Sequence, residues 1–370
     1  MRLETVRFVV DDEAHADYHR AVWLLADALA VIGARDRVVP TLLALFEEVL
    51  PNRDHRLPLS SVPVKVWIAH EAGLPLLTDL PRDVTVELLT TPDAPLPSDP
   101  AGVRFWVPPF LSSGNVVNFA GKLADLRVIQ LLSAGADAWV GRVPPGVTLH
   151  DARGVHSSST SEWIVAAILA HVRDLPGFIR GQAAREWSYA RYAPTDELAG
   201  KRVLIVGAGA IGEATAARLD PFDVSVVRVA RTARPGVHGI DELPALLPEA
   251  DVVVLIVPLT AETRGMVDAD FLARMRDGAL LVNAARGPVV DTAALTDALA
   301  GGRLAAAVDV TDPEPLPADH PLWEMPNFLL TPHVAGSVRG LMPRAYRLVG
   351  DQIRRYLAGQ PLINEVRDGY

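Results

Sequence analysis

The chain has 370 residues, is 49% hydrophobic and carries a formal net charge of −10 with a pI of about 5.5. This length predicts two domains with sizeable cores, and the acidic balance argues against nucleic-acid binding while suiting a cytoplasmic enzyme. The absence of cysteine excludes disulfides, zinc–thiolate sites and cysteine nucleophiles, and the longest apolar runs are strand-sized, too short to span a bilayer.

Residues 1–62 form an expected N-terminal extension whose role the sequence does not reveal. Apolar residues at helical spacing predict helices over 14–32 and 41–50, and residues 6–10 have the composition of a strand. The polar, proline-punctuated residues 52–63 are typical of a linker. No signal peptide is visible, because acidic residues precede any long apolar run.

From Val64 the pattern changes to strands alternating with helices, which indicates a parallel α/β sheet. The predicted strands cover residues 64–69, 84–89, 103–107, 126–132 and 147–150. The fourth strand ends in Ser133-Ala134-Gly135. Small residues at the carboxyl end of a parallel strand let the backbone approach a ligand, although a plain turn is the alternative reading.

The hydroxyl-rich residues 157–161 are predicted to cap a helix over 162–172 that crosses into a second domain. Residues 181–194, rich in Trp and Tyr, are expected to form a loop that packs over the domain junction. The predicted domains are residues 63–160 plus 337–370 and residues 161–336. A last helix over 339–357 should return across the first domain.

A glycine-rich turn organises the second domain. The buried-strand pattern of 203–206 is followed by Gly207, Gly209 and Gly212 at G-x-G-x-x-G spacing, then by a helix and a further strand. The first glycine permits the tight turn, the second lets backbone approach a pyrophosphate, and the third lets the helix pack closely. In this context we predict dinucleotide binding, with an ordinary glycine turn as the alternative. Further strands are expected at 224–229, 252–257, 280–283, 305–310 and 328–330.

The end of the second strand of this domain predicts which cofactor binds. An acidic residue usually stands there to accept hydrogen bonds from ribose hydroxyls. This chain instead has Ala230, followed by Arg231, Thr232 and Arg234. Guanidinium groups and a hydroxyl suit a 2′-phosphate, so NADP(H) is preferred over NAD(H), unless the arginines form an ordinary basic surface turn.

Three later strands each end in charged residues at the edge that carries the glycine turn. They supply Arg286, then Asp309 and Glu314, and finally His333. Taken singly, each has an ordinary interpretation: Arg286 in a surface ion pair, Asp309 as a turn cap and His333 as a buried histidine with satisfied hydrogen bonds. Together they suit carbonyl reduction, in which a protonated histidine donates a proton and an arginine stabilises developing negative charge.

From Val64 onward the chain resembles the D-isomer-specific 2-hydroxyacid dehydrogenases, in a branch like the NADP-preferring glyoxylate/hydroxypyruvate reductases. The resemblance rests on five spaced motifs: the glycine turn, residues 257–263, 283–287 and 309–315, and Thr331-Pro332-His333. It implies a flavodoxin-like substrate domain, a Rossmann domain and a homodimer. It places Arg286, Glu314 and His333 on the family's catalytic positions, and Asp309 near the nicotinamide. It implies that the backbone of Ser133, Ala134 and Gly135, together with Arg286, binds the substrate carboxylate. The expected cofactor contacts are Gly207, Gly209, Ala210, Ile211, Gly212, Arg231, Thr232, Arg234, Val257, Pro258, Thr263, Ala284, Ala285, Asp309, His333 and Gly336.

Alternatives to a 2-keto acid reductase remain. Glu314 argues against formate oxidation, because related formate dehydrogenases carry glutamine there, but phosphite oxidation stays open. A dinucleotide-sensing protein like the carboxyl-terminal-binding corepressors would keep the same triad. The substrate side chain is not identified, although Trp106, Pro108, Phe110 and Leu111 are candidates to line its pocket, the aromatic ones being equally plausible as core.

Overall fold

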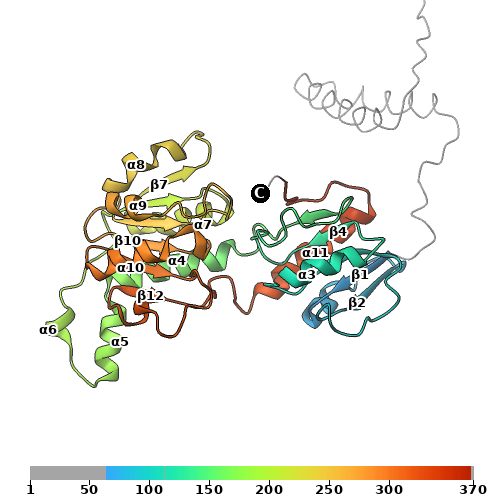
Figure 1. Cartoon of the computed structure of the whole chain (residues 1–370), viewed down its shortest axis with the longest axis horizontal. Coiled ribbons are helices and arrows are strands. Elements are labelled where there is room, and N and C mark those ends of the chain that lie inside the picture. Colours follow the sequence, from blue (N-terminus) through green and yellow to red (C-terminus); the bar gives the residue numbers. More distant parts are fainter. Residues whose placement is uncertain (1–63, 113, 368–370) are drawn as a thin grey trace, which may run out of the picture. The chain divides into compact units, whose positions relative to one another are not determined.

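The structure, a computed structural model, describes residues 64–112 and 114–367 (Figure 1). The helices and strand expected within residues 1–62 lie outside the described residues. The first sheet has five parallel strands in the order β2-β1-β3-β4-β5, which is the flavodoxin-like order. Its strands are β1 (Val64–Ile68), β2 (Val84–Leu88), β3 (Val103–Val107), β4 (Val128–Gln130) and β5 (Thr148–His150).

Both faces of this sheet are covered. Helix α11 (Leu341–Leu357) and the 3-10 helix η1 (Glu71–Leu76) pack against one face, where Val66, Phe105 and Tyr346 are buried. Figure 1 shows α11, in red, alongside the blue and teal strands. The other face packs against α3 (Gly114–Phe119) and η2 (Ala120–Lys122). The last helix therefore returns to the first sheet, as its position after the final strand predicts.

The second sheet has seven parallel strands in the order β12-β11-β10-β9-β6-β7-β8. Read from β6, this is the Rossmann order with one more strand at an edge. Its strands are β6 (Arg202–Val206), β7 (Ser225–Ala230), β8 (His238–Gly239), β9 (Val252–Leu255), β10 (Leu280–Asn283), β11 (Ala305–Val308) and β12 (Phe328–Leu330). The sequence did not predict β8, because two residues are too short to show a strand pattern.

Helices flank both faces of the second sheet. On one side α4 (Ser157–Val172) and α7 (Ala210–Leu219) cover buried residues such as Ile205 and Val254. On the other lie α8 (Leu243–Leu246), α9 (Ala269–Arg274) and α10 (Thr292–Ala300), over Leu204 and Val253. The expected pair of doubly wound parallel sheets is thus confirmed. In the part of the chain that the structure describes, no helix is both long and apolar enough to cross a membrane.

The hydroxyl-rich segment before the crossing helix is not a cap, contrary to the sequence prediction. Helix α4 already begins at Ser157, and its N-cap is His156 without a side-chain cap bond. Ser161 donates its hydroxyl hydrogen bonds to the carbonyls of Ser157 and Ser158, at 2.5 and 3.0 Å. Serine side chains inside a helix bond back to preceding carbonyls in this way, so a run of hydroxyls does not by itself mark a boundary.

The aromatic segment 181–194 also differs from its prediction as a packed loop. It contains the end of α5 (Leu175–Ala183) and the short helix α6 (Tyr189–Tyr192). Trp187 is 96% exposed, so it does not pack over a junction within this chain. The predicted domain boundaries remain a prediction.

Candidate active site

The three motif glycines occupy different surroundings after β6. Gly207 has φ 119°, and a side chain there would collide with the Ile256 carbonyl, while one on Gly212 would lie 2.0 Å from the Gly207 carbonyl oxygen. Gly209, in contrast, has nothing within 4 Å of where its Cβ would stand. Ala210 and Ile211 open α7 directly behind it. The turn therefore leaves open space before a helix N-terminus, which fits a bound pyrophosphate.

The arginine loop follows β7 as expected. Arg231, Thr232 and Arg234 are all exposed beyond Ala230. Arg234 Nη2 donates to the Ala208 carbonyl of the glycine turn at 2.7 Å, which ties the two loops together. This places positive charge beside the glycine turn.

Two further predicted cofactor segments follow β9 and β10. Thr263 Oγ1 donates to the Pro258 carbonyl at 2.6 Å, which closes a turn just after Val257. Ala284 and Ala285 follow β10, at the edge of the sheet where the glycine turn ends β6. β6 and β9 are adjacent strands at which the strand order reverses, the place where open α/β sheets bind ligands.

Arg286 is set by a side-chain-stabilised turn at the end of β10. Buried Asn283 accepts from the Ala285 N–H at 3.0 Å and donates to the Arg286 carbonyl at 3.1 Å. The guanidinium itself reaches the segment after β4, where it packs on Gly135: a Cβ on that glycine would lie 1.4 Å from Arg286 Nη2. Within the same segment Ser133 Oγ donates to the Gly135 carbonyl at 2.8 Å. Two predicted substrate-binding segments, far apart in sequence, are thus brought together.

Asp309 organises the loop that carries His333. Its carboxylate is buried and accepts from Thr331 Oγ1 at 2.6 Å and from the N–H groups of Val334 and Ala335, both at 2.8 Å. Its carbonyl accepts from the His333 N–H at 2.7 Å. These bonds hold His333 in a left-handed conformation with φ 55°. The contact of Asp309 with a cofactor remains a prediction.

His333 and Glu314 form the predicted pair. His333 Nδ1 lies 2.8 Å from Glu314 Oε1, with side chains 29% and 44% exposed. An ionised carboxylate can only accept, so Nδ1 carries a hydrogen and Nε2 is left to exchange a proton. Among the described residues, no hydrogen bond or ion pair joins this pair to Arg286.

His156 is a site-adjacent residue that the sequence did not single out. It is 7% exposed, its Nε2 lies 2.8 Å from the Leu132 carbonyl oxygen, and its ring stacks on Phe110 at 5.9 Å. Its Nδ1 lies against Gly336, where a Cβ would come within 2.8 Å. Burial lowers the pKa of His156. The ring therefore packs between the strand that leads to Ser133 and the end of the His333 loop.

Of the aromatic pocket candidates, Trp106 belongs to the core. It is fully buried, with its ring 5.4 Å from Phe119 and 5.8 Å from Trp139. Leu111 is 51% exposed. Residues alternate across a strand, so Trp106 packs in the hydrophobic cluster on the face opposite to Phe105 and Val107.

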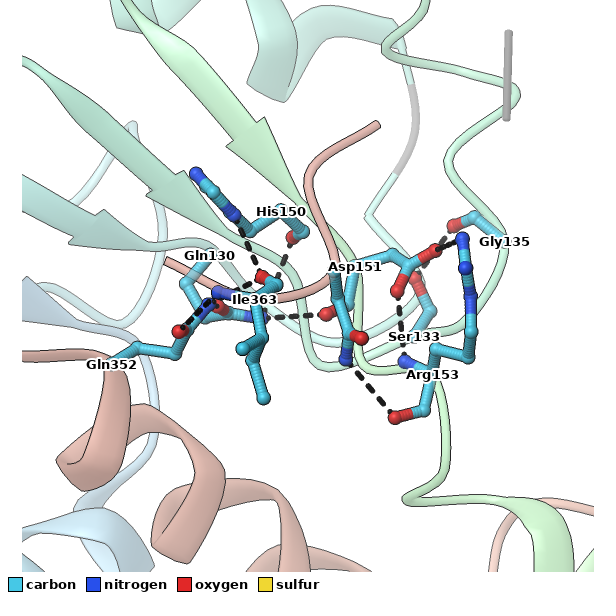
Figure 2. Close-up of polar contacts among 9 residues, drawn as sticks. Gln130, Ser133, Gly135, His150, Asp151, Arg153, Gln352 and Ile363 are labelled. Carbon is cyan, nitrogen blue, oxygen red and sulfur yellow. Dashed lines mark hydrogen bonds and ion pairs between the residues drawn. The ribbon is translucent and has the colours of Figure 1, made fainter. Parts of the chain in front are cut away.

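A buried polar network surrounds Gln130 at the end of β4, the strand from which the Ser133-Ala134-Gly135 segment follows (Figure 2). Gln130, at the end of β4, donates to the carbonyls of Leu131 and Asp151 and accepts from Gln352 of α11 at 2.9 Å. Gln352 in turn donates to the Ile363 carbonyl at 2.8 Å. The network ties the C-terminal segment and α11 to the strand from which Ser133 follows.

The chain is similar to several known proteins. Residues 165–335 match the family described as D-isomer specific 2-hydroxyacid dehydrogenase, NAD binding domain. A glyoxylate reductase of Thermofilum pendens is 37% identical over 64% of this chain and 73% of its own length. Formate dehydrogenase 2 of rice is 37% identical over 65% of this chain and 66% of its own length. A D-isomer specific 2-hydroxyacid dehydrogenase of Xanthobacter autotrophicus, solved with NADPH and MES, has a TM-score of 0.70 and 32% identity, covering 82% of this chain and 100% of that one.

Proposed function

The chain belongs to the D-isomer specific 2-hydroxyacid dehydrogenase family, and from this we propose that it reduces a small 2-keto acid to the D-2-hydroxy acid with NADPH. The observation that carries the proposal is the 2.8 Å contact between His333 and Glu314, on a loop that Asp309 fixes. An NAD(P)-dependent 2-hydroxyacid or glyoxylate reductase activity is what the family supports. A homodimer in the cytoplasm is the corresponding expectation for assembly and location.

The chain's own residues have distinct roles in this reaction. The nicotinamide cofactor, when bound, supplies the hydride. His333 delivers a proton from Nε2 to the keto oxygen, and such acid catalysis is worth about 10²- to 10⁴-fold. Glu314 holds the ring in place through its contact with Nδ1. Arg286 binds the substrate carboxylate and keto oxygen, which both orients the substrate and offsets the developing negative charge.

The NADP(H) preference is supported by two features of the arginine loop. No carboxylate stands at Ala230 to repel a 2′-phosphate, and Arg231 and Arg234 are exposed in the loop that follows β7. The Xanthobacter relative was solved with NADPH. NAD(H) is the alternative, because the matched family domain is described as NAD binding.

A substrate screen tests the proposal. Glyoxylate, hydroxypyruvate, pyruvate and phenylpyruvate are offered with NADPH and with NADH, and cofactor oxidation is followed by absorbance. We expect turnover of at least one 2-keto acid, faster with NADPH. Arg286→Ala should lower turnover and weaken substrate binding together while leaving NADPH binding nearly intact.

Formate and phosphite with NADP⁺ or NAD⁺ complete the screen. Oxidation of either, without 2-keto acid reduction, would replace the proposed reaction with the corresponding oxidation. Tight dinucleotide binding without any turnover would instead indicate a dinucleotide sensor.

A further inference from the structure

Asp137 is a charged residue beside the site that the proposed mechanism does not use. It lies two residues beyond Gly135, and its carboxylate Oδ1 accepts from Arg286 Nε at 3.1 Å. The two side chains are 29% and 26% exposed, so the ion pair is partly shielded from water. The segment is anchored just beyond, where Trp139 is buried and its N–H donates to the Ala136 carbonyl at 2.8 Å.

Two nitrogens of the Arg286 guanidinium donate hydrogen bonds to the protein. Nε is engaged by Asp137, and Nη1 donates to the Ala285 carbonyl at 2.8 Å. These two bonds fix the plane of the guanidinium, because it is rigid. Nη2 is the nitrogen that lies against Gly135. Nη2 of Arg286 therefore lies next to the backbone of Gly135, which is expected to bind the substrate carboxylate.

We propose that Asp137 is a positioning residue that holds Arg286 over the Ser133-Ala134-Gly135 segment, so that Nη2 can bind the carboxylate of a 2-keto acid. The inference rests on the proposed function. It also explains why residue 135 is glycine, since any side chain there would displace the guanidinium.

The charge of Asp137 has a separate and opposite effect. A second carboxylate arriving at Arg286 is repelled by the one already there, so Asp137 lowers substrate affinity while it improves orientation. The two effects can be separated. Asparagine keeps an oxygen acceptor for Arg286 Nε but removes the negative charge, whereas alanine removes both.

Kinetics of the two variants test the inference. Asp137→Ala should lower kcat by roughly tenfold to a hundredfold and raise KM, since a displacement of about 1 Å can cost that much. Asp137→Asn should keep kcat within a few-fold of the wild type, with an unchanged or lower KM. Asp93→Ala, at an exposed position after β2, is the matched control and should behave as wild type.

Calorimetric binding of oxalate to the full chain with NADP⁺ gives a readout independent of turnover. Asp137→Ala should weaken oxalate binding at least about tenfold, and Asp137→Asn should bind at least as tightly as wild type. Equal kcat and oxalate affinity in Asp137→Ala and wild type overturn the positioning role. So does an Asp137→Asn variant that binds oxalate more weakly than wild type, even if Asp137→Ala does not fold. A wild-type protein that neither reduces 2-keto acids nor binds oxalate overturns both the proposed function and this inference. An active wild-type protein whose kinetics and oxalate affinity do not change in Asp137→Ala overturns the inference alone.

Discussion

His333 combines a strained backbone with an anchored side chain. A non-glycine residue at φ 55° costs on the order of 1–3 kcal/mol, and the bonds to buried Asp309 hold the loop against that cost. Glu314 then fixes the ring through Nδ1. The orientation of the imidazole ring is thus set by contacts within the protein.

This arrangement predicts that the orientation of the His333 ring depends on Glu314. Glu314→Ala removes the acceptor that holds Nδ1, so the rate of 2-keto acid reduction should fall by about tenfold or more. Steady-state rates of the two proteins check this, and an unchanged rate in Glu314→Ala would show that Glu314 does not position the ring.

The contact of His156 with Gly336 makes a second prediction. A methyl group on Gly336 would lie 2.8 Å from the buried ring, so Gly336→Ala should destabilise the protein by about 1–3 kcal/mol. His156→Ala should relieve the clash, so the double variant should lose less than the sum of the single changes. Gly121→Ala is the control, because nothing lies within 4 Å of its Cβ position. Additive losses in urea unfolding would show that the two residues do not press on each other.

The elements that the sequence predicted well are those with a strong local cause. The apolar run of β6, the spacing of Gly207 and Gly212, and the charged residues after β10 to β12 each have a local pattern that survives folding. The failures have a non-local cause. Residues 157–161 could equally cap a helix or continue one. The two residues of β8 form a strand only because they pair with β7. The packing of His156 depends on Gly336, which lies more than a hundred residues away in the sequence.

The loop after β7 is the element that should decide between the two cofactors. Ala230→Asp with Arg231→Ala restores a ribose-binding carboxylate and removes a phosphate-binding cation, so NADH should become the better cofactor. A lost charge-assisted hydrogen bond is worth about 1.5–3 kcal/mol, which corresponds to roughly a tenfold to hundredfold change in kcat/KM. The change should lie mainly in KM, because the adenosine end is remote from the hydride.

A matched control for the cofactor exchange lies at the amino end of β9, whereas the arginine loop follows the carboxyl end of β7. Arg276→Ala removes a cation that pairs with Asp251 before β9, and it should leave the NADPH to NADH ratio unchanged. Added salt should weaken NADPH binding more than NADH binding, since the arginine loop is exposed. Equal use of both cofactors by the parent protein would refute this reading of the loop and leave the dehydrogenase assignment in place.

At the scale of the whole molecule, buried and partly buried histidines couple folding to pH. Burial lowers the pKa of His70, His150, His156 and His171 below the ordinary 6.5. The unfolded chain therefore binds protons at these groups more readily than the folded protein does. Their contribution to stability is fully present above about pH 6.5 and is lost as pH falls below that value. Asp151 acts in the opposite direction, because burial raises its pKa and its charged form is disfavoured in the fold.

We therefore expect the Tm to decline as pH is lowered from about 7.5 to about 5.5, the range in which these histidines gain protons in the unfolded chain. His171→Gln replaces one partly buried titrating ring with a group that stays neutral, so the decline should become shallower, while any change in Tm above about pH 7.5 should not depend on pH. Differential scanning calorimetry in closely spaced buffers measures both slopes. A decline as steep in His171→Gln as in the parent would mean that folding does not lower the pKa of this histidine.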